Sequence, residues 1–130
     1  MIWQQGENDA NQNDAHAAEY GANLSHLIAR VRAQFHAPDL VFVYGYVLPP
    51  PNAQPGRDAV RRGEHDVDQD SGAPLAVKGA FVVATDDLSQ RADDPASPYP
   101  KDRLHFGTAG TLELGHRMAD KMRAAIGKKT

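Results

Sequence analysis

The nine-residue run Leu40–Leu48, LVFVYGYVL, is the feature that most constrains the fold. It is apolar and rich in β-branched and aromatic residues. A strand with one face in water alternates apolar and polar residues, whereas a continuous apolar run is typical of a strand covered on both faces. Pro49–Pro51 end the run, because proline lacks the N–H group that a strand ladder requires. The run therefore predicts an inner strand of a parallel sheet.

The rest of the chain alternates between strand and helix patterns. The predicted order is strand, helix, strand, loop, strand, loop and helix, over residues 1–4, 15–35, 40–48, 52–74, 77–85, 86–101 and 108–126. Within the first loop, residues 58–64 are compatible with one or two helical turns. Strands that alternate with helices indicate an α/β protein with a parallel sheet.

Each predicted helix has one apolar face at helical spacing. In the first helix this face comprises Tyr20, Leu24, Leu27, Ile28, Val31 and Phe35. In the last helix it comprises Leu112, Gly115, Ala119, Met122 and Ile126.

Length and charge narrow the class of protein. A chain of 130 residues is enough for one small domain, and we expect residues 1–130 to form a single one. The net charge of −3 offers no basic surface, so neither nucleic acid nor a membrane is expected as a partner. The absence of cysteine excludes disulfides, thiolate nucleophiles and thiolate zinc sites. We expect no cofactor and no bound metal.

The amino terminus lacks the basic start and the long apolar stretch of a signal peptide. No apolar run approaches the length that spans a bilayer. The sequence as written therefore predicts a cytoplasmic protein, and a secreted or periplasmic one if a further segment precedes Met1.

The segment Asp102-Arg103-Leu104-His105-Phe106 precedes the last predicted helix. A carboxylate three residues before a histidine can orient and charge-balance an imidazole that acts as a general base. We interpret His105 as the base and Asp102 as the group that orients it. A structural alternative is a loop aspartate followed by a histidine that caps the helix.

A second polar block, Gln5-Gly6-Glu7-Asn8-Asp9, follows the first predicted strand. The N–H group of Gly6 and a side-chain amide of Gln5 or Asn8 can line an oxyanion hole, while Glu7 can fix the loop or contact a substrate hydroxyl. The structural alternative is a strand-to-helix turn with capping side chains. Loops after parallel strands build the sites of open α/β sheets, so we expect both blocks on one rim.

The acidic loop 66–72 offers a third interpretation. Alternating carboxylates at Asp66, Asp68 and Asp70 suit a hard cation such as calcium. However, Gly72 is one place late for an EF-hand loop, and Val77 stands where a bidentate glutamate is required. A solvated acidic loop is the simpler interpretation, and a calcium-binding structural domain remains an alternative.

Taken together, the two polar blocks resemble the SGNH-hydrolase superfamily, in particular the sialate O-acetylesterase and acetylxylan-esterase branch, carbohydrate esterase family six. That branch has a W-x-Q-G-E-x-D-A block after a central strand and a D-x-x-H-F block before a helix with L-G-x-R-x-A. The matching residues are Trp3, Gln5, Gly6, Glu7, Asp9, Ala10, Asp102, His105, Phe106, Leu114, Gly115, Arg117 and Ala119. The resemblance implies the C-terminal portion of a flavodoxin-like SGNH-hydrolase parallel sheet flanked by helices. It also implies a serine esterase that removes acetyl groups from a carbohydrate substrate.

The family's nucleophilic serine lies in a G-Q-S-N-type block upstream of the Q-G-E block, and none of the serines here matches it. They are Ser25, Ser71, Ser89 and Ser97. The nucleophile is therefore unknown, and we expect a truncated domain whose serine lies upstream of Met1 or on another chain. A sheet without its first strands would leave Leu40–Leu48 poorly covered, so we expect marginal stability or a homo-oligomer. The alternative is an inactive remnant that serves as a binding module.

Overall fold

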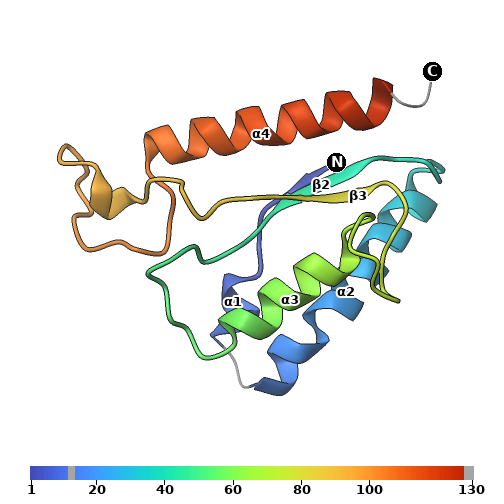
Figure 1. The fold of residues 1–130 in the computed structure, drawn as a ribbon, viewed down its shortest axis with the longest axis horizontal. Helices are drawn as coiled ribbons and strands as arrows, with labels where there is room; N and C mark the ends of the chain where they lie inside the picture. Colours follow the sequence, from blue (N-terminus) through green and yellow to red (C-terminus); the bar gives the residue numbers. More distant parts are fainter. Residues whose placement is uncertain (12–13, 128–130) are drawn as a thin grey trace.

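The computed structural model describes residues 1–11 and 14–127, and it shows a small sheet flanked by helices (Figure 1). The elements in chain order are β1 (Ile2–Trp3), α1 (Glu7–Ala10), α2 (Asp14–Gln34), β2 (Phe42–Gly45), α3 (Arg57–Val67), β3 (Ala80–Val83), the 3-10 helix η1 (Arg91–Asp93) and α4 (Thr108–Gly127). None of the described helices combines the length and the apolar character needed to cross a membrane.

The three strands are parallel and stand in the order β1-β2-β3. In register, Trp3 pairs with Tyr44, which in turn pairs with Val82. Parallel neighbours need crossover connections, and these are provided by α2 and α3. Both crossover helices lie on one face of the sheet and α4 lies on the other (Figure 1). The predicted α/β class with a parallel sheet is confirmed.

The middle strand β2 is covered on both faces, as its composition predicts. Phe42 and Tyr44 belong to the core shared with α2 and α3, whereas Val41 and Val43 belong to the core under α4. None of these four side chains is more than 7% exposed. The expectation that Leu40–Leu48 would be poorly covered is therefore wrong, because helices of this chain pack against both sides of the sheet.

Helices α2 and α3 approach each other closely at two glycines. A Cβ atom on Gly63 would lie 2.6 Å from the backbone nitrogen of Gly21, too close for any side chain. Next to this contact, Tyr20 is buried as the sequence predicts. Phe35, in contrast, follows the last residue of α2 and is 70% exposed, so its predicted place in the core is wrong.

The buried face of α4 is not the predicted one. Leu114 and Met118 are buried in the core that contains Val43, whereas Leu112 and Ile126 are 62% and 54% exposed. Leu112 and Leu114 are two residues apart, about 200° around a helix, so they cannot both face the sheet. Met122, from the predicted face, packs at the border of this core.

Helix α3 is longer than the one or two turns expected at 58–64. Its buried positions are Val60, Glu64 and Val67, which have the spacing of one helical face. Glu64 is 1% exposed and accepts the backbone N–H of Val47 at 3.2 Å. Desolvation raises the pKa of Glu64 well above its usual value. Because an acidic residue occupies the middle of the buried face, the sequence hides the helical periodicity.

Candidate active site in the loop before α4

Asp102 and His105 form a hydrogen-bonded pair in the loop before α4. Nδ1 of His105 lies 2.8 Å from Oδ2 of Asp102. The other carboxylate oxygen, Oδ1, accepts the backbone N–H groups of Leu104 and His105 at 3.0 and 3.1 Å. The Asp102 side chain is 18% exposed and the His105 side chain 58% exposed. The loop therefore presents the imidazole to solvent while it shields the carboxylate behind it.

The charge of Asp102 decides which ring nitrogen of His105 carries the proton. Partial desolvation raises the pKa of Asp102, but the hydrogen bonds from His105 and from the Leu104 N–H outweigh it and hold the pKa below its usual range. Asp102 is then ionised at neutral pH and can only accept hydrogen bonds. In neutral His105 the proton must reside on Nδ1, which leaves the Nε2 lone pair free. This is the form that a general base requires.

The 3-10 helix η1 holds the loop of this pair from the side. The backbone N–H of Arg91 donates to the carbonyl of His105 at 3.0 Å. The backbone N–H of Ala92 donates to the carbonyl of Asp102 at 3.0 Å. Both residues of the pair are thus fixed through their main chains as well as through their side chains.

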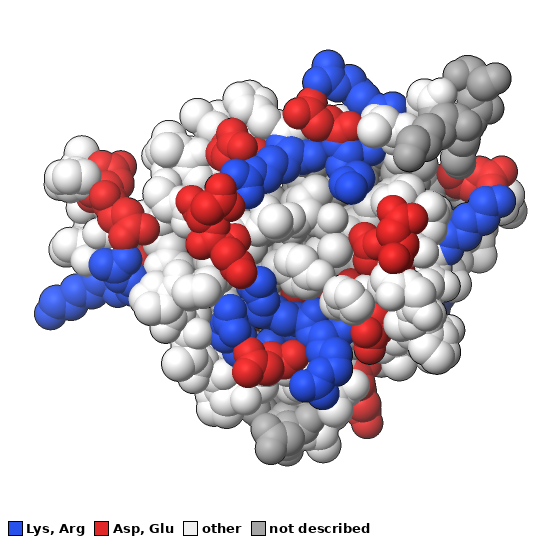
Figure 2. All heavy atoms as spheres, in the orientation of Figure 1, with Lys and Arg blue, Asp and Glu red and all other residues white. Residues whose placement is uncertain are grey.

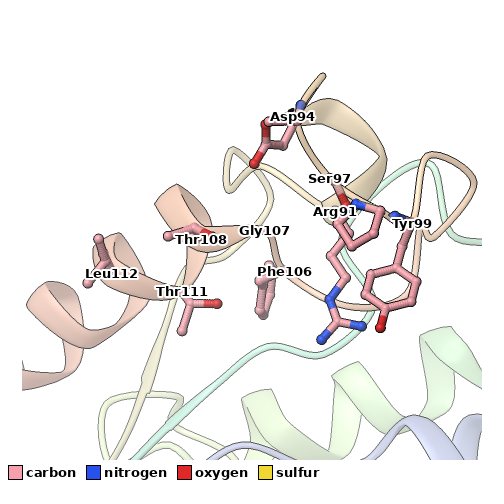
Figure 3. Close-up of a pocket in the computed structure, with 11 residues that line it drawn as sticks. Arg91, Asp94, Ser97, Tyr99, Phe106, Gly107, Thr108, Thr111 and Leu112 are labelled. Carbon is pink, nitrogen blue, oxygen red and sulfur yellow. Dashed lines mark hydrogen bonds between the residues drawn. The ribbon is translucent and has the colours of Figure 1, made fainter.

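A surface hollow of about 480 Å³ reaches Phe106, the residue that follows His105 in the chain (Figure 3). Its lining combines aromatic side chains, hydroxyl groups and charged groups, among them Arg91, Asp94, Ser97, Tyr99, Phe106, Thr108, Thr111 and Leu112. Arg91 connects the hollow to the pair, since its Nη1 lies 3.3 Å from Oδ2 of Asp102 and its guanidinium lies 4.8 Å from the ring centroid of Tyr99. Aromatic faces next to polar groups suit a ligand that carries both, such as a sugar.

The family to which the chain belongs follows from a comparison with known families. The family model described as carbohydrate esterase, sialic acid-specific acetylesterase, matches residues 1–124 of this chain. The chain belongs to this family. The relationship predicted from the two polar blocks is therefore confirmed, and the Asp102–His105 pair lies within the part of the chain that matches.

A solved structure supports the same fold. The chain resembles a protein from Arabidopsis thaliana whose X-ray structure was determined at 1.6 Å resolution, with a TM-score of 0.69 and 21% sequence identity. The similarity covers 97% of this chain and 43% of the plant protein, so the chain spans less than half of that structure. No curated protein matches the chain.

The amino-terminal block of this carbohydrate esterase chain is packed against the crossover helices. Gly6 is buried and has φ of +149°, and an added Cβ would lie 3.1 Å from Val60 and 3.2 Å from Tyr20. The hydroxyl of Tyr20 donates to the carbonyl of Gln5. The side-chain amide of Gln5 lies 3.4 Å from Oδ2 of Asp9. These contacts give the block a structural role that accounts for the glycine.

Glu7 and Asn8 lie in the short helix α1. Glu7 is partly buried in its first turn, and Asn8 is exposed. An oxyanion or substrate role for Gln5, Gly6, Glu7 and Asn8 therefore stays a prediction.

The first block directly follows β1, whereas Asp102 and His105 lie in the loop between β3 and α4. Helix α1 contacts α2 and α3, whereas the Asp102–His105 loop lies beside the start of α4 (Figure 1). Among the described residues, no hydrogen bond or ion pair joins the two blocks, and no serine hydroxyl is bonded to His105. The nucleophile is therefore still unidentified.

The acidic loop has a structural explanation in this fold. Oδ2 of Asp68 accepts the N–H of Val82 in β3 at 2.7 Å, and Oδ1 accepts the N–H of Asp70 at 2.8 Å. Both oxygens of the central carboxylate are thus engaged with the backbone. Over the described part of the chain, no cluster of three acidic or histidine residues has the arrangement of a metal site.

The loop after β3 is fixed by two ion pairs from opposite layers. Arg61 of α3 lies 2.6 Å from Asp86, and Arg117 of α4 contacts Asp87 at 2.7 and 2.6 Å through two nitrogens. On the face drawn in Figure 2, acidic and basic side chains are interspersed in this way. Arg117, which matches the family's last block, therefore joins α4 to the sheet edge.

Arg91 and Tyr99 were not predicted as site residues. Both lie in the stretch 86–101, which the sequence marks only as a proline-rich loop. Their contact with each other and with Asp102 depends on the fold of η1. No spacing rule in the sequence signals it.

Proposed function

We propose that this chain is part of the catalytic domain of a carbohydrate O-acetylesterase, in which His105 is the general base and Asp102 orients it. The substrate is an acetylated carbohydrate, and the ester is cleaved by a serine provided by a segment outside residues 1–130 or by another chain. The observation that carries the proposal is the short hydrogen bond from Nδ1 of His105 to Asp102 within a chain of the esterase family.

The proposed chemistry is acyl transfer in two steps. Nε2 of His105 takes the proton of the serine hydroxyl while the oxygen attacks the acetyl carbonyl, and the sugar alcohol leaves with that proton. Water then attacks the acetyl-serine, with His105 again taking and returning a proton, and acetate is released. Asp102 stays ionised and stabilises the imidazolium that forms in each step.

The hollow that reaches Phe106 supports the carbohydrate as the substrate class. Tyr99 and Phe106 offer aromatic surface, and Thr108 and Thr111 come from the first turn of α4. A sugar ring has apolar faces and hydroxyl edges, which such a lining can contact at the same time. We place the sugar there, with its acetyl group directed toward His105.

The proposal is tested on the longest natural reading frame that contains these residues. The encoded protein should hydrolyse 4-nitrophenyl acetate and release acetate from acetylated sugars. Replacing His105 by Ala should lower kcat/KM by about three to four orders of magnitude, and Asp102→Asn by a similar or smaller factor.

The matched control is His116→Ala. His116 follows Glu113 at the same three-residue spacing, but its Nδ1 lies 4.0 Å from that carboxylate and its side chain is 79% exposed. This substitution should leave hydrolysis unchanged. Full activity of the His105→Ala variant, or no hydrolysis by the longest natural protein, would contradict the proposal.

The alternative role, an inactive remnant that binds carbohydrate, rests on the unidentified nucleophile. It uses the same hollow and predicts binding of acetylated sugars without release of acetate. Calorimetric titration together with an acetate assay separates the two roles. Binding without turnover, in a natural protein that contains no serine near His105, would favour the binding module.

A further inference from the structure

Arg91 contacts the catalytic pair from the side that faces the hollow. Its Nη1 lies 3.3 Å from Oδ2 of Asp102, the same oxygen that accepts the hydrogen bond from Nδ1 of His105 at 2.8 Å. One carboxylate oxygen is therefore shared between a guanidinium and an imidazole. The Arg91 side chain is 41% exposed, so it borders both the loop and the solvent of the hollow.

The position of Arg91 is fixed independently of this contact. Its backbone N–H donates to the carbonyl of His105, and the preceding residue, Gln90, pairs with Phe106 in an antiparallel bridge. Its guanidinium lies over the ring of Tyr99, as Figure 3 shows. An arginine held at its backbone and at its planar head loses little further entropy when it binds a carboxylate.

We propose that Arg91 is a positioning residue, which holds Oδ2 of Asp102 in the place where it orients the imidazole of His105. This inference rests on the proposed function, because it assigns a role within the same site. Oδ1 is already fixed by two backbone N–H groups, so Arg91 supplies the fixed partner of the second oxygen. With both oxygens fixed, the carboxylate cannot rotate about its last bond.

The test follows the tautomer of neutral His105 by NMR in the full 130-residue chain, without substrate. In Arg91→Met the fraction of the Nδ1–H tautomer should fall, because Oδ2 of Asp102 loses a fixed partner. Arg91→Lys should restore only part of that fraction, since an ammonium lacks the planar fork.

Arg103→Met is the matched control, because it removes an equal charge near the pair. The ion-pair partner of Arg103 is Asp93 and not Asp102. The fraction of the Nδ1–H tautomer in this variant should equal that of the parent. An unchanged tautomer in Arg91→Met would overturn the inference, and so would an equal change in Arg103→Met. If Arg91→Met does not fold, Arg91→Lys is measured instead. An Nδ1–H fraction in Arg91→Lys equal to that of the parent would then overturn the inference. The readout needs no ester hydrolysis, so failure of the proposed function is observed separately, as absence of acetate release.

Discussion

The two polar blocks that identify the family differ in what surrounds them. The block at Gly6 is buried among Tyr20 and Val60, and its unusual backbone is explained by that packing. The block at Asp102 and His105 is held by hydrogen bonds and leaves the imidazole 58% exposed. In the first block Gly6 is packed against the crossover helices, whereas in the second an imidazole is oriented by a carboxylate and left accessible. Two sequence motifs of equal strength therefore lie in different surroundings.

Of the substitutions that distinguish the two blocks, His105→Ala should have the largest effect on hydrolysis. In the longest natural protein we expect a loss of hydrolysis of about three to four orders of magnitude, because the proposed general base is removed. The midpoint of urea unfolding of the 130-residue chain should fall only slightly, because the ring is mostly exposed and only its hydrogen bond to Asp102 is lost. Esterase kinetics and denaturation curves check both parts. A large fall in stability would show that this block, too, is mainly structural.

Gly6→Ala should have the next largest effect, and this effect should be on stability. The new Cβ meets Val60 and Tyr20 at positive φ, and we expect a loss of about 2–4 kcal/mol in the free energy of unfolding. Gly72→Ala is the control, because Gly72 has φ of +71° but nothing within 4 Å of the added Cβ. It should cost only about 1–2 kcal/mol. Equal losses at both sites would show that packing around Gly6 contributes nothing.

The sequence predicts much of this fold, for reasons that individual residues make plain. Leu40–Leu48 identifies the central strand because a continuous apolar run has few other stable places. The sequence does not reveal which side of α4 is buried, since Leu112 and Leu114 are equally apolar and the sheet decides between them. Helix α3 is hidden because its middle core position is Glu64.

For the site, spacing predicts a local pair such as Asp102 and His105, because three residues fix their separation. The role of Arg91 depends on contacts across a loop, so no local pattern in the sequence could predict it.

Tyr20→Phe tests how much a single hydroxyl group beside the first block contributes to stability. It removes the hydrogen bond to the carbonyl of Gln5 and should cost about 1 kcal/mol of stability. The same change at Tyr99, whose residue is 54% exposed beside the other block, should cost almost nothing. Urea unfolding of the two variants measures this difference. A larger loss at Tyr99 would reverse the assignment of structural and accessible regions.

The smallest expected effect is a pH dependence of stability that arises from Asp102. Hydrogen bonds lower its pKa in the folded chain, so its stabilising contribution is complete above its unfolded pKa of about 3.9. The contribution is lost as the pH falls through the lower folded pKa. The stability difference between the parent and Asp102→Asn should therefore shrink between about pH 5 and pH 2. Asp87, whose pKa is lowered to about 2 by Arg117, should behave in the same direction and is the positive control. A constant difference for Asp102→Asn would contradict the assignment.

The central claim is that Asp102 holds His105 with Nε2 unprotonated and available as a base. Nitrogen-15 NMR of the ring, recorded at a pH high enough that its spectrum no longer changes, tests this most directly. The account predicts the proton on Nδ1 and a bare Nε2 in the parent, with loss of that preference in Asp102→Ala. A proton on Nε2 in the parent chain would contradict it.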